Sequence, residues 1–156
     1  MSAEKARKYL ESVGLADRII IPEKSSATVE EAAIAVGCAP KQIAKTMSFY
    51  QLEGPVLIVM AGDARVDNSK YKAVFHQKAK MIPGDEVEAA IGHAPGGVCP
   101  FGANENVKTY LDISLKRFER VYPAAGSGHS AVNLTVSELQ SASKAVDWID
   151  VCKDWQ

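Results

Sequence analysis

The sequence lacks the features that mark membrane, secreted and metal-dependent proteins. No apolar run approaches the roughly 20 residues that a membrane-spanning helix needs, and the amino-terminal MSAEKARKYLESVG has no signal-peptide core. Its 3 cysteines stand far apart, with no Cys-x-x-Cys pair and no histidine at metal-ligand spacing. These absences predict a cytoplasmic protein in a reducing compartment, with no disulfide framework, no metal site and no membrane association.

The common hydrolase signatures are also absent. The chain has no Gly-x-Ser-x-Gly, no His-Glu-x-x-His and no convincing carboxylate pair. Asp63 and Asp67 are close in sequence, but carboxylates in loops are usually just solvated. Cys99 lies in a glycine-rich stretch, yet no histidine is adjacent to it in the sequence, so we do not favour a thiol nucleophile.

Length and composition predict one globular domain. The chain has 156 residues, of which 47% are hydrophobic and 24% charged. No repeat, low-complexity segment or linker divides it, so we expect a single domain over residues 1–156.

Apolar spacing and capping motifs give the expected elements. Helices are predicted at 3–13, 28–36, 40–44, 68–76 (with Asn68 as its cap), 83–92 and 136–143. Strands are predicted at 18–23, 45–52, 55–62, 107–113, 120–126 and 130–136, with 146–151 as a strand or final turn. These elements do not alternate regularly, which favours an α+β fold over a doubly wound sheet.

The most concentrated signal is the segment GGVCPFG at 96–102. Glycine permits positive φ and a close approach of a ligand to the backbone, and Pro100 keeps the segment out of a helix or a central strand. Such a loop can present N–H groups to a carbonyl or phosphate oxygen. An ordinary surface turn is the alternative interpretation.

Two further segments accompany this loop. Lys45 opens the apolar run KTMSFYQL, and AAGSGH follows downstream at 124–129. With AKTMSF, GGVCPFG and AAGSGH in this order and spacing, the chain from about Ala27 to Val151 resembles the YbaK/EbsC family. That family includes free-standing aminoacyl-tRNA deacylases and the editing domain inserted in bacterial prolyl-tRNA synthetases. Its Gly-x-x-x-Pro loop is matched by Gly96–Pro100, and its strand-opening lysine by Lys45.

The resemblance implies a fold and a reaction. The implied fold is a mixed, mainly antiparallel sheet curled into a barrel-like core with helices packed outside. The implied reaction removes a small non-cognate amino acid, such as alanine, cysteine, serine or threonine, from a mischarged tRNA (a tRNA for proline or a related one), with no cofactor. The neighbouring ribose hydroxyl can position or activate the water. The implied catalytic residues are Lys45 and, in the loop whose amides stabilise the oxyanion, Gly96, Gly97 and Pro100.

Substrate-binding residues are expected on the same segments: Met47, Val98, Cys99, Phe101, Gly102, Ser127 and His129. His129 is either a general base or a group that positions the ester, and we favour positioning. Lys45 also has a plainer interpretation, as a surface lysine that blocks pairing at a strand edge.

Charge is uneven along the chain, although the net charge is −1. Residues 64–80 hold a basic island, from which we expect Arg65, Lys70 and Lys72 to bind the tRNA acceptor end. A solvated helix face is the alternative. The competing function is a non-catalytic module that binds aminoacyl-tRNA or a nucleotide and docks on an aminoacyl-tRNA synthetase, which makes a synthetase a second candidate partner.

Overall fold

The computed structural model describes residues 2–21, 28–127 and 130–155. The α-helices are α1 (Ser2–Ser12), α2 (Val29–Val36), α3 (Asn68–Phe75), α4 (Val87–Ile91) and α5 (Val136–Ser143). The strands are β1 (Ile19–Ile20), β2 (Ile43–Gln51), β3 (Gly54–Ala61), β4 (Arg65–Val66), β5 (Lys108–Asp112), β6 (Arg120–Pro123), β7 (Ala131–Val132), β8 (Leu134–Thr135), β9 (Asp147–Ile149) and β10 (Cys152–Lys153). Short 3₁₀ turns occupy Ala16–Arg18, Pro40–Gln42 and Ile113–Arg117.

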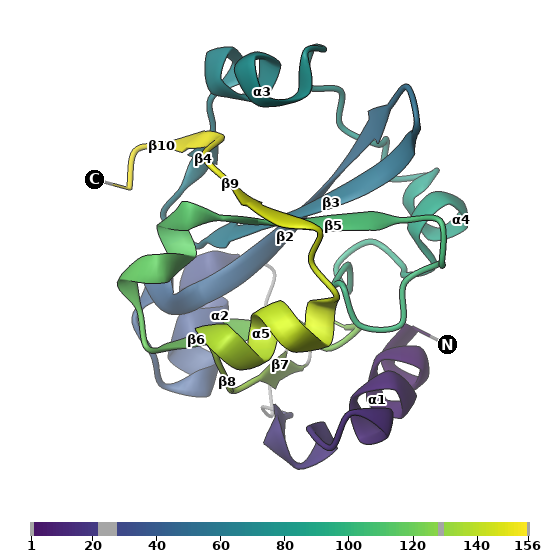
Figure 1. Cartoon of the computed structure of the whole chain (residues 1–156). Coiled ribbons are helices and arrows are strands. Elements are labelled where there is room, and N and C mark those ends of the chain that lie inside the picture. The colour runs from purple at the N-terminus through teal and green to yellow at the C-terminus, as the bar shows by residue number, and fades with distance from the viewer. Residues whose placement is uncertain (1, 22–27, 128–129, 156) are drawn as a thin grey trace.

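A mixed six-stranded sheet in the order β8-β6-β2-β3-β5-β9 forms the centre of the molecule. The predicted hairpin is confirmed: β2 and β3 pair antiparallel from Ala44 opposite Ala61 to Gln51 opposite Gly54. Parallel pairs flank the hairpin, since β2 joins β6 and β3 joins β5. The sheet curls, and helices lie outside it, as expected (Figure 1).

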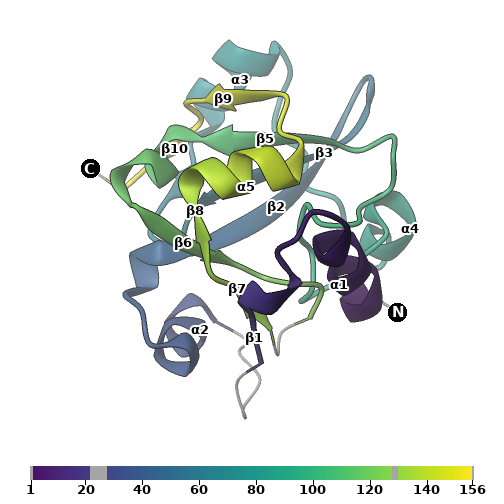
Figure 2. The same cartoon turned by 60° about the horizontal axis from the view of Figure 1, so that its bottom comes forward.

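The helices cover different parts of the sheet. In both views α5 lies across the sheet, while α3 lies at the end of the molecule opposite α1 and α2 (Figure 1, Figure 2). Strand β3 forms the buried centre, because the side chains from Val56 to Ala61 are at most 3% exposed. The apolar run at 55–62 is therefore the predicted central strand, buried by neighbours on both sides.

Several predicted boundaries are wrong in detail. Asp67, and not Asn68, caps α3: its carboxylate accepts hydrogen bonds from the backbone N–H groups of Ser69 and Lys70. The helix expected at 40–44 is a single 3₁₀ turn, so β2 begins at Ile43.

The segment expected as one strand at 130–136 is broken in two. Strand β7 pairs with β1, and β8 pairs with β6. Between them, the N–H of Asn133 donates to the backbone oxygen of Arg18. The chain thus changes partner at Asn133, which strand propensity alone does not reveal.

One detail of the pairing opens the site. Strand β6 pairs with β2 only at Ile43 and Ala44. From Lys45 to Met47 this side of β2 has no strand partner among the described residues, and the space beside it is left to α2 and to the loops. A backbone bridge resumes at Phe49, which lies opposite Met81.

Candidate active site

A cavity of about 340 Å³ lies where β2 loses its second partner. Helix α2, the start of β2 and the two glycine-rich loops surround it. Most of its lining is small and apolar, and its polar side chains are Thr28, Lys45, Thr46, Tyr122, Ser127 and Ser130. None of the described residues that line it is acidic. A small cavity of this composition suits a small, largely apolar group with a few polar atoms.

Lys45 is the cation of this cavity. It is half-buried, and its Nζ lies 3.4 Å from the backbone oxygen of Gly62, to which it donates. Burial lowers the pKa of its ammonium, because desolvation disfavours the charged form. Among the described residues it forms no ion pair, so most of its hydrogen-bonding capacity is left for a ligand. A solvated edge lysine would not show this burial.

The two glycine-rich loops pack directly on each other at the cavity. A Cβ on Gly97 would lie 2.1 Å from the oxygen of Gly126, so only glycine fits there. The N–H of Gly97 is already used, since it donates to the oxygen of Ala94 at 3.0 Å. Gly96 and Val98 line the cavity instead, and within the described chain their N–H groups have no protein acceptor. Any oxyanion contact from this loop therefore falls to Gly96 and Val98.

Thr46 and Ser130 also line the cavity, and the sequence did not predict either of them. The Oγ1 of Thr46 is buried, and no other described group bonds to it. Buried hydroxyls are usually satisfied, so this atom marks a place where a ligand can supply the missing partner. The hydroxyl of Ser130 lies 3.1 Å from that of Ser127, a predicted substrate-binding residue that does line the cavity. Thr46 follows Lys45 directly, and that adjacency is the one signal in the sequence that points to it.

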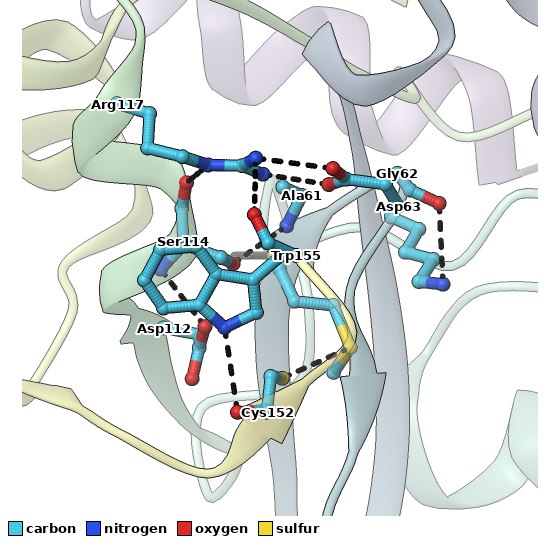
Figure 3. Close-up of polar contacts among 10 residues, drawn as sticks. Ala61, Gly62, Asp63, Asp112, Ser114, Arg117, Cys152 and Trp155 are labelled. Carbon is cyan, nitrogen blue, oxygen red and sulfur yellow. Dashed lines mark hydrogen bonds and ion pairs between the residues drawn. The ribbon is translucent and has the colours of Figure 1, made fainter.

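A salt-bridged cluster fixes the end of β3, which carries the lysine's acceptor. Arg117 binds Asp63 through both carboxylate oxygens, at 2.6 and 3.0 Å (Figure 3). Partial burial opposes ionisation of Asp63, but the hydrogen bonds and charge of Arg117 outweigh it and lower the pKa. Asp63 is bonded directly to Gly62, so this fork holds the carbonyl that accepts from Lys45.

The carboxy-terminal residues support the same cluster. Arg117 also donates to the backbone oxygen of Trp155 at 2.8 Å and lies over its ring (Figure 3). The Ser114 hydroxyl accepts from the N–H of Ala61, and the Asp112 carboxylate binds the N–H groups of Ser114 and Val151. Segments that are far apart in the sequence thus fix the position of the end of β3.

Some predicted substrate-binding side chains point elsewhere. Those of Cys99 and Phe101 are fully buried, and neither lines the cavity. Phe101 stacks on Tyr9 of α1, and Gly102 lies against the backbone of Lys5. Pro100, in the same loop, is also buried and does not line the cavity.

Cys99 has a histidine beside it in space, though not in sequence. His93 donates from Nε2 to the oxygen of Phe101 at 2.7 Å, and the Cys99 Sγ lies 3.6 Å from that nitrogen. Burial raises the pKa of the thiol to about 12 and lowers that of the imidazole. Both groups are therefore neutral, which argues against a thiolate nucleophile at Cys99.

The remaining predicted residues that the structure describes lie in three places. Met47 and Arg65 line a second cavity that shares Lys45 with the first. Lys70 is held by Asp150 at 3.1 Å and by the oxygen of Cys152, whereas Lys72 lies at a separate hollow beside α3. His129 lies outside the described residues.

Comparison with known proteins decides the family. The model of the aminoacyl-tRNA editing domain matches residues 23–142, which include Lys45 and both glycine loops. The chain belongs to this family. It is 46% identical over its whole length to the full-length "Uncharacterized protein YwhH" of Bacillus subtilis. Part of the chain, 57%, is 33% identical to the proline–tRNA ligase of Kosmotoga olearia, but spans only 16% of that ligase.

A solved structure agrees with this assignment. A crystal structure described as that of a candidate trans-editing enzyme for prolyl tRNA synthetase superposes with a TM-score of 0.88. It is 29% identical, with 97% of each chain covered. The family resemblance and the predicted fold are thereby confirmed.

Neither a membrane-spanning helix nor a cluster of metal ligands is present in the part of the chain that the structure describes. None of the helices has the length and apolar character that crossing a membrane requires. In the same part of the chain, no three His, Cys, Asp or Glu side chains converge as metal ligands.

Proposed function

We propose that this protein is a free-standing hydrolase that deacylates mischarged tRNA. The observation that carries the proposal is the joining, in one small cavity, of a half-buried lysine and a glycine loop with unused N–H groups. Family membership and the trans-editing structural relative support it. The whole chain, residues 1–156, then serves as one editing domain.

The reaction needs little from side chains, because an aminoacyl ester is already activated. A water oxygen attacks the ester carbonyl, the bond from that carbon to the ribose oxygen breaks, and the ribose oxygen takes up a proton. The N–H groups of Gly96 and Val98 stabilise the oxyanion, and losing one such donor typically costs about 2.7–4 kcal/mol. The neighbouring ribose hydroxyl orients the water, and Lys45 binds the ribose or its phosphate as a point charge.

The cavity favours a small amino acid. Val29, Ala32, Ala44 and Ala131 leave room for a short side chain, and the Thr46 hydroxyl supplies a polar contact. Alanine, cysteine, serine and threonine fit this description. Discrimination among them will be modest, because one methylene changes binding by only about 1–3 kcal/mol.

The decisive experiment is a deacylation assay with a panel of charged tRNAs, beginning with tRNA for proline carrying alanine, cysteine, serine or threonine. We expect release of the amino acid from at least one mischarged species, with or without EDTA. Lys45→Ala should reduce the rate severely, while Lys8→Ala, an exposed lysine on α1, should not. Tight binding without hydrolysis of any charged tRNA would instead identify a non-catalytic binding module that can dock on a synthetase.

A further inference from the structure

Lys45 separates the first cavity from a second one, of about 430 Å³. Because side chains alternate along a strand, Lys45, Met47 and Phe49 point to the same face of β2. Met60, directly opposite Lys45 on β3, shares that face. The second cavity therefore has an apolar floor with a cation at one edge.

Met81 forms the outer wall of this cavity and is held rigidly there. The N–H of Tyr50 donates to Lys80 and that of Ile82 donates to Ser48, so Met81 is clamped opposite Phe49 by backbone bonds on both sides. Its side chain is nevertheless 56% exposed. A flexible, polarisable side chain on a fixed backbone makes an adaptable surface for a flat ring.

Positive charge extends from the mouth of this cavity. Arg65 is exposed at its rim. Asn68 and Ala79 also line a neighbouring hollow of about 350 Å³, where Lys72 and Lys78 lie. No acidic side chain occurs among the described residues lining either hollow. Proteins bind unpaired nucleotides with a row of cations beside a surface on which the bases lie, which is usually aromatic and here is formed by the polarisable side chains of methionines.

We propose that this second cavity and the basic hollow bind the unpaired 3′-terminal nucleotides of the tRNA acceptor strand. The terminal base lies on Met47 and Met81, and the preceding phosphates lie beside Arg65, Lys72 and Lys78. This assignment rests on the proposed function, because it places the terminal ribose at Lys45, between its base and its amino acid. The exposed amide of Asn68 is placed to bond a base edge.

The test uses uncharged RNA, so it does not depend on hydrolysis. Fluorescence anisotropy compares an acceptor-stem hairpin ending in an unpaired CCA with the same hairpin cut blunt. We expect the full-length protein to bind the CCA hairpin at least about 5-fold more tightly, as base stacking provides. Met81→Glu should remove this preference. Leu52→Glu, a matched change at a 91% exposed apolar residue on the β2–β3 turn, should keep it.

The basic hollow is tested by salt dependence. Arg65→Glu should reduce the slope of log affinity against log salt by about 1, and Arg7→Glu, an exposed arginine on α1, should leave it unchanged. Equal affinity for the two hairpins would overturn the proposal, even if the protein deacylates tRNA. If Met81→Glu fails to fold, Asn68→Ala at an exposed position replaces it in the comparison. Absence of RNA binding, with self-association that Met81→Glu abolishes, would mark the surface as a contact between copies of the chain.

Discussion

The two sides of the first cavity are held by opposite means. At the end of β3, side chains hold the backbone: Arg117 grips Asp63 and the oxygen of Trp155. At the glycine loops the fit is steric, because the backbone of Gly126 lies so close to Gly97 that no side chain fits on Gly97. The hydrogen bonds of Arg117 can be weakened gradually by substitution, whereas the contact at Gly97 leaves no room for even one added carbon atom.

The largest effect is therefore expected from Gly97→Ala. Its methyl group would lie 2.1 Å from the Gly126 oxygen and must push the two loops apart. Overpacking of this kind costs about 1–3 kcal/mol, and the displaced Gly96 and Val98 should also lose their contact with the ester. Thermal unfolding and single-turnover deacylation measure the two losses.

Gly84→Ala is the matched control for this change. A Cβ there meets nothing within 4 Å, and its φ is not in the left-handed region. We expect the free energy of unfolding of the Gly84→Ala variant to differ from that of the unchanged protein by no more than about 1 kcal/mol. Equal behaviour of the two variants would show that the contact between the glycine loops does not shape the cavity.

Arg117→Lys should have an intermediate effect on the other side of the cavity. Lysine keeps the charge but cannot form the two-pronged bond to Asp63. A looser Gly62 would let water reach Lys45, so the depressed pKa of that ammonium should rise toward its ordinary value. Titration by NMR of the Lys45 side chain follows this shift, and kcat should fall several-fold with little change in KM.

Arg120→Lys provides the comparison for that experiment. Arg120 is exposed on β6, two strands from β3 in the sheet order, and it donates to the side-chain oxygen of Asn133 instead of to Asp63. It should leave both the Lys45 titration and kcat unchanged. An unaltered Lys45 pKa in Arg117→Lys would show that the salt-bridged cluster supports the fold alone.

The smallest effect on activity is expected from Cys99→Ser, because the buried thiol does not line the cavity and takes no part in the proposed reaction. With a pKa raised to about 12, the native thiol should resist iodoacetamide at pH 8 and react only after unfolding. As pH rises past about 8.5, the unfolded thiol ionises and the folded thiol does not. The free energy of unfolding should then fall, less steeply in Cys99→Ser. A covalent adduct at Cys99 during turnover would contradict this account.

The sequence predicted the parts of the site that local patterns encode. Length and apolar runs indicated the β2–β3 hairpin, and the positions of Lys45 and the glycines carried the resemblance to the family. Strand alternation also explains why Met47 and Thr46 lie in different cavities: Met47 shares a face with Lys45 and lines the second cavity, whereas Thr46 lines the first.

The features of the site that the sequence did not predict have a common physical cause, which is contact between distant segments. Cys99 and Phe101 are buried because α1 covers their loop, with Tyr9 stacked on Phe101. Lys70 is occupied by Asp150, and Arg117 meets Asp63 and Trp155. Local periodicity in the sequence does not encode these contacts, since each of them forms only when the folded sheet places distant segments side by side.

The position of Lys45 on the wall between two cavities has a thermodynamic consequence. The Lys45 ammonium has one position and one protonation state at a time, and it lines both cavities. A ligand that moves or desolvates it in one cavity alters the free energy of binding in the other. Thermodynamic linkage requires this coupling to be reciprocal. If a ligand in the first cavity changes the affinity of the second cavity by some factor, a ligand in the second cavity changes the affinity of the first by the same factor.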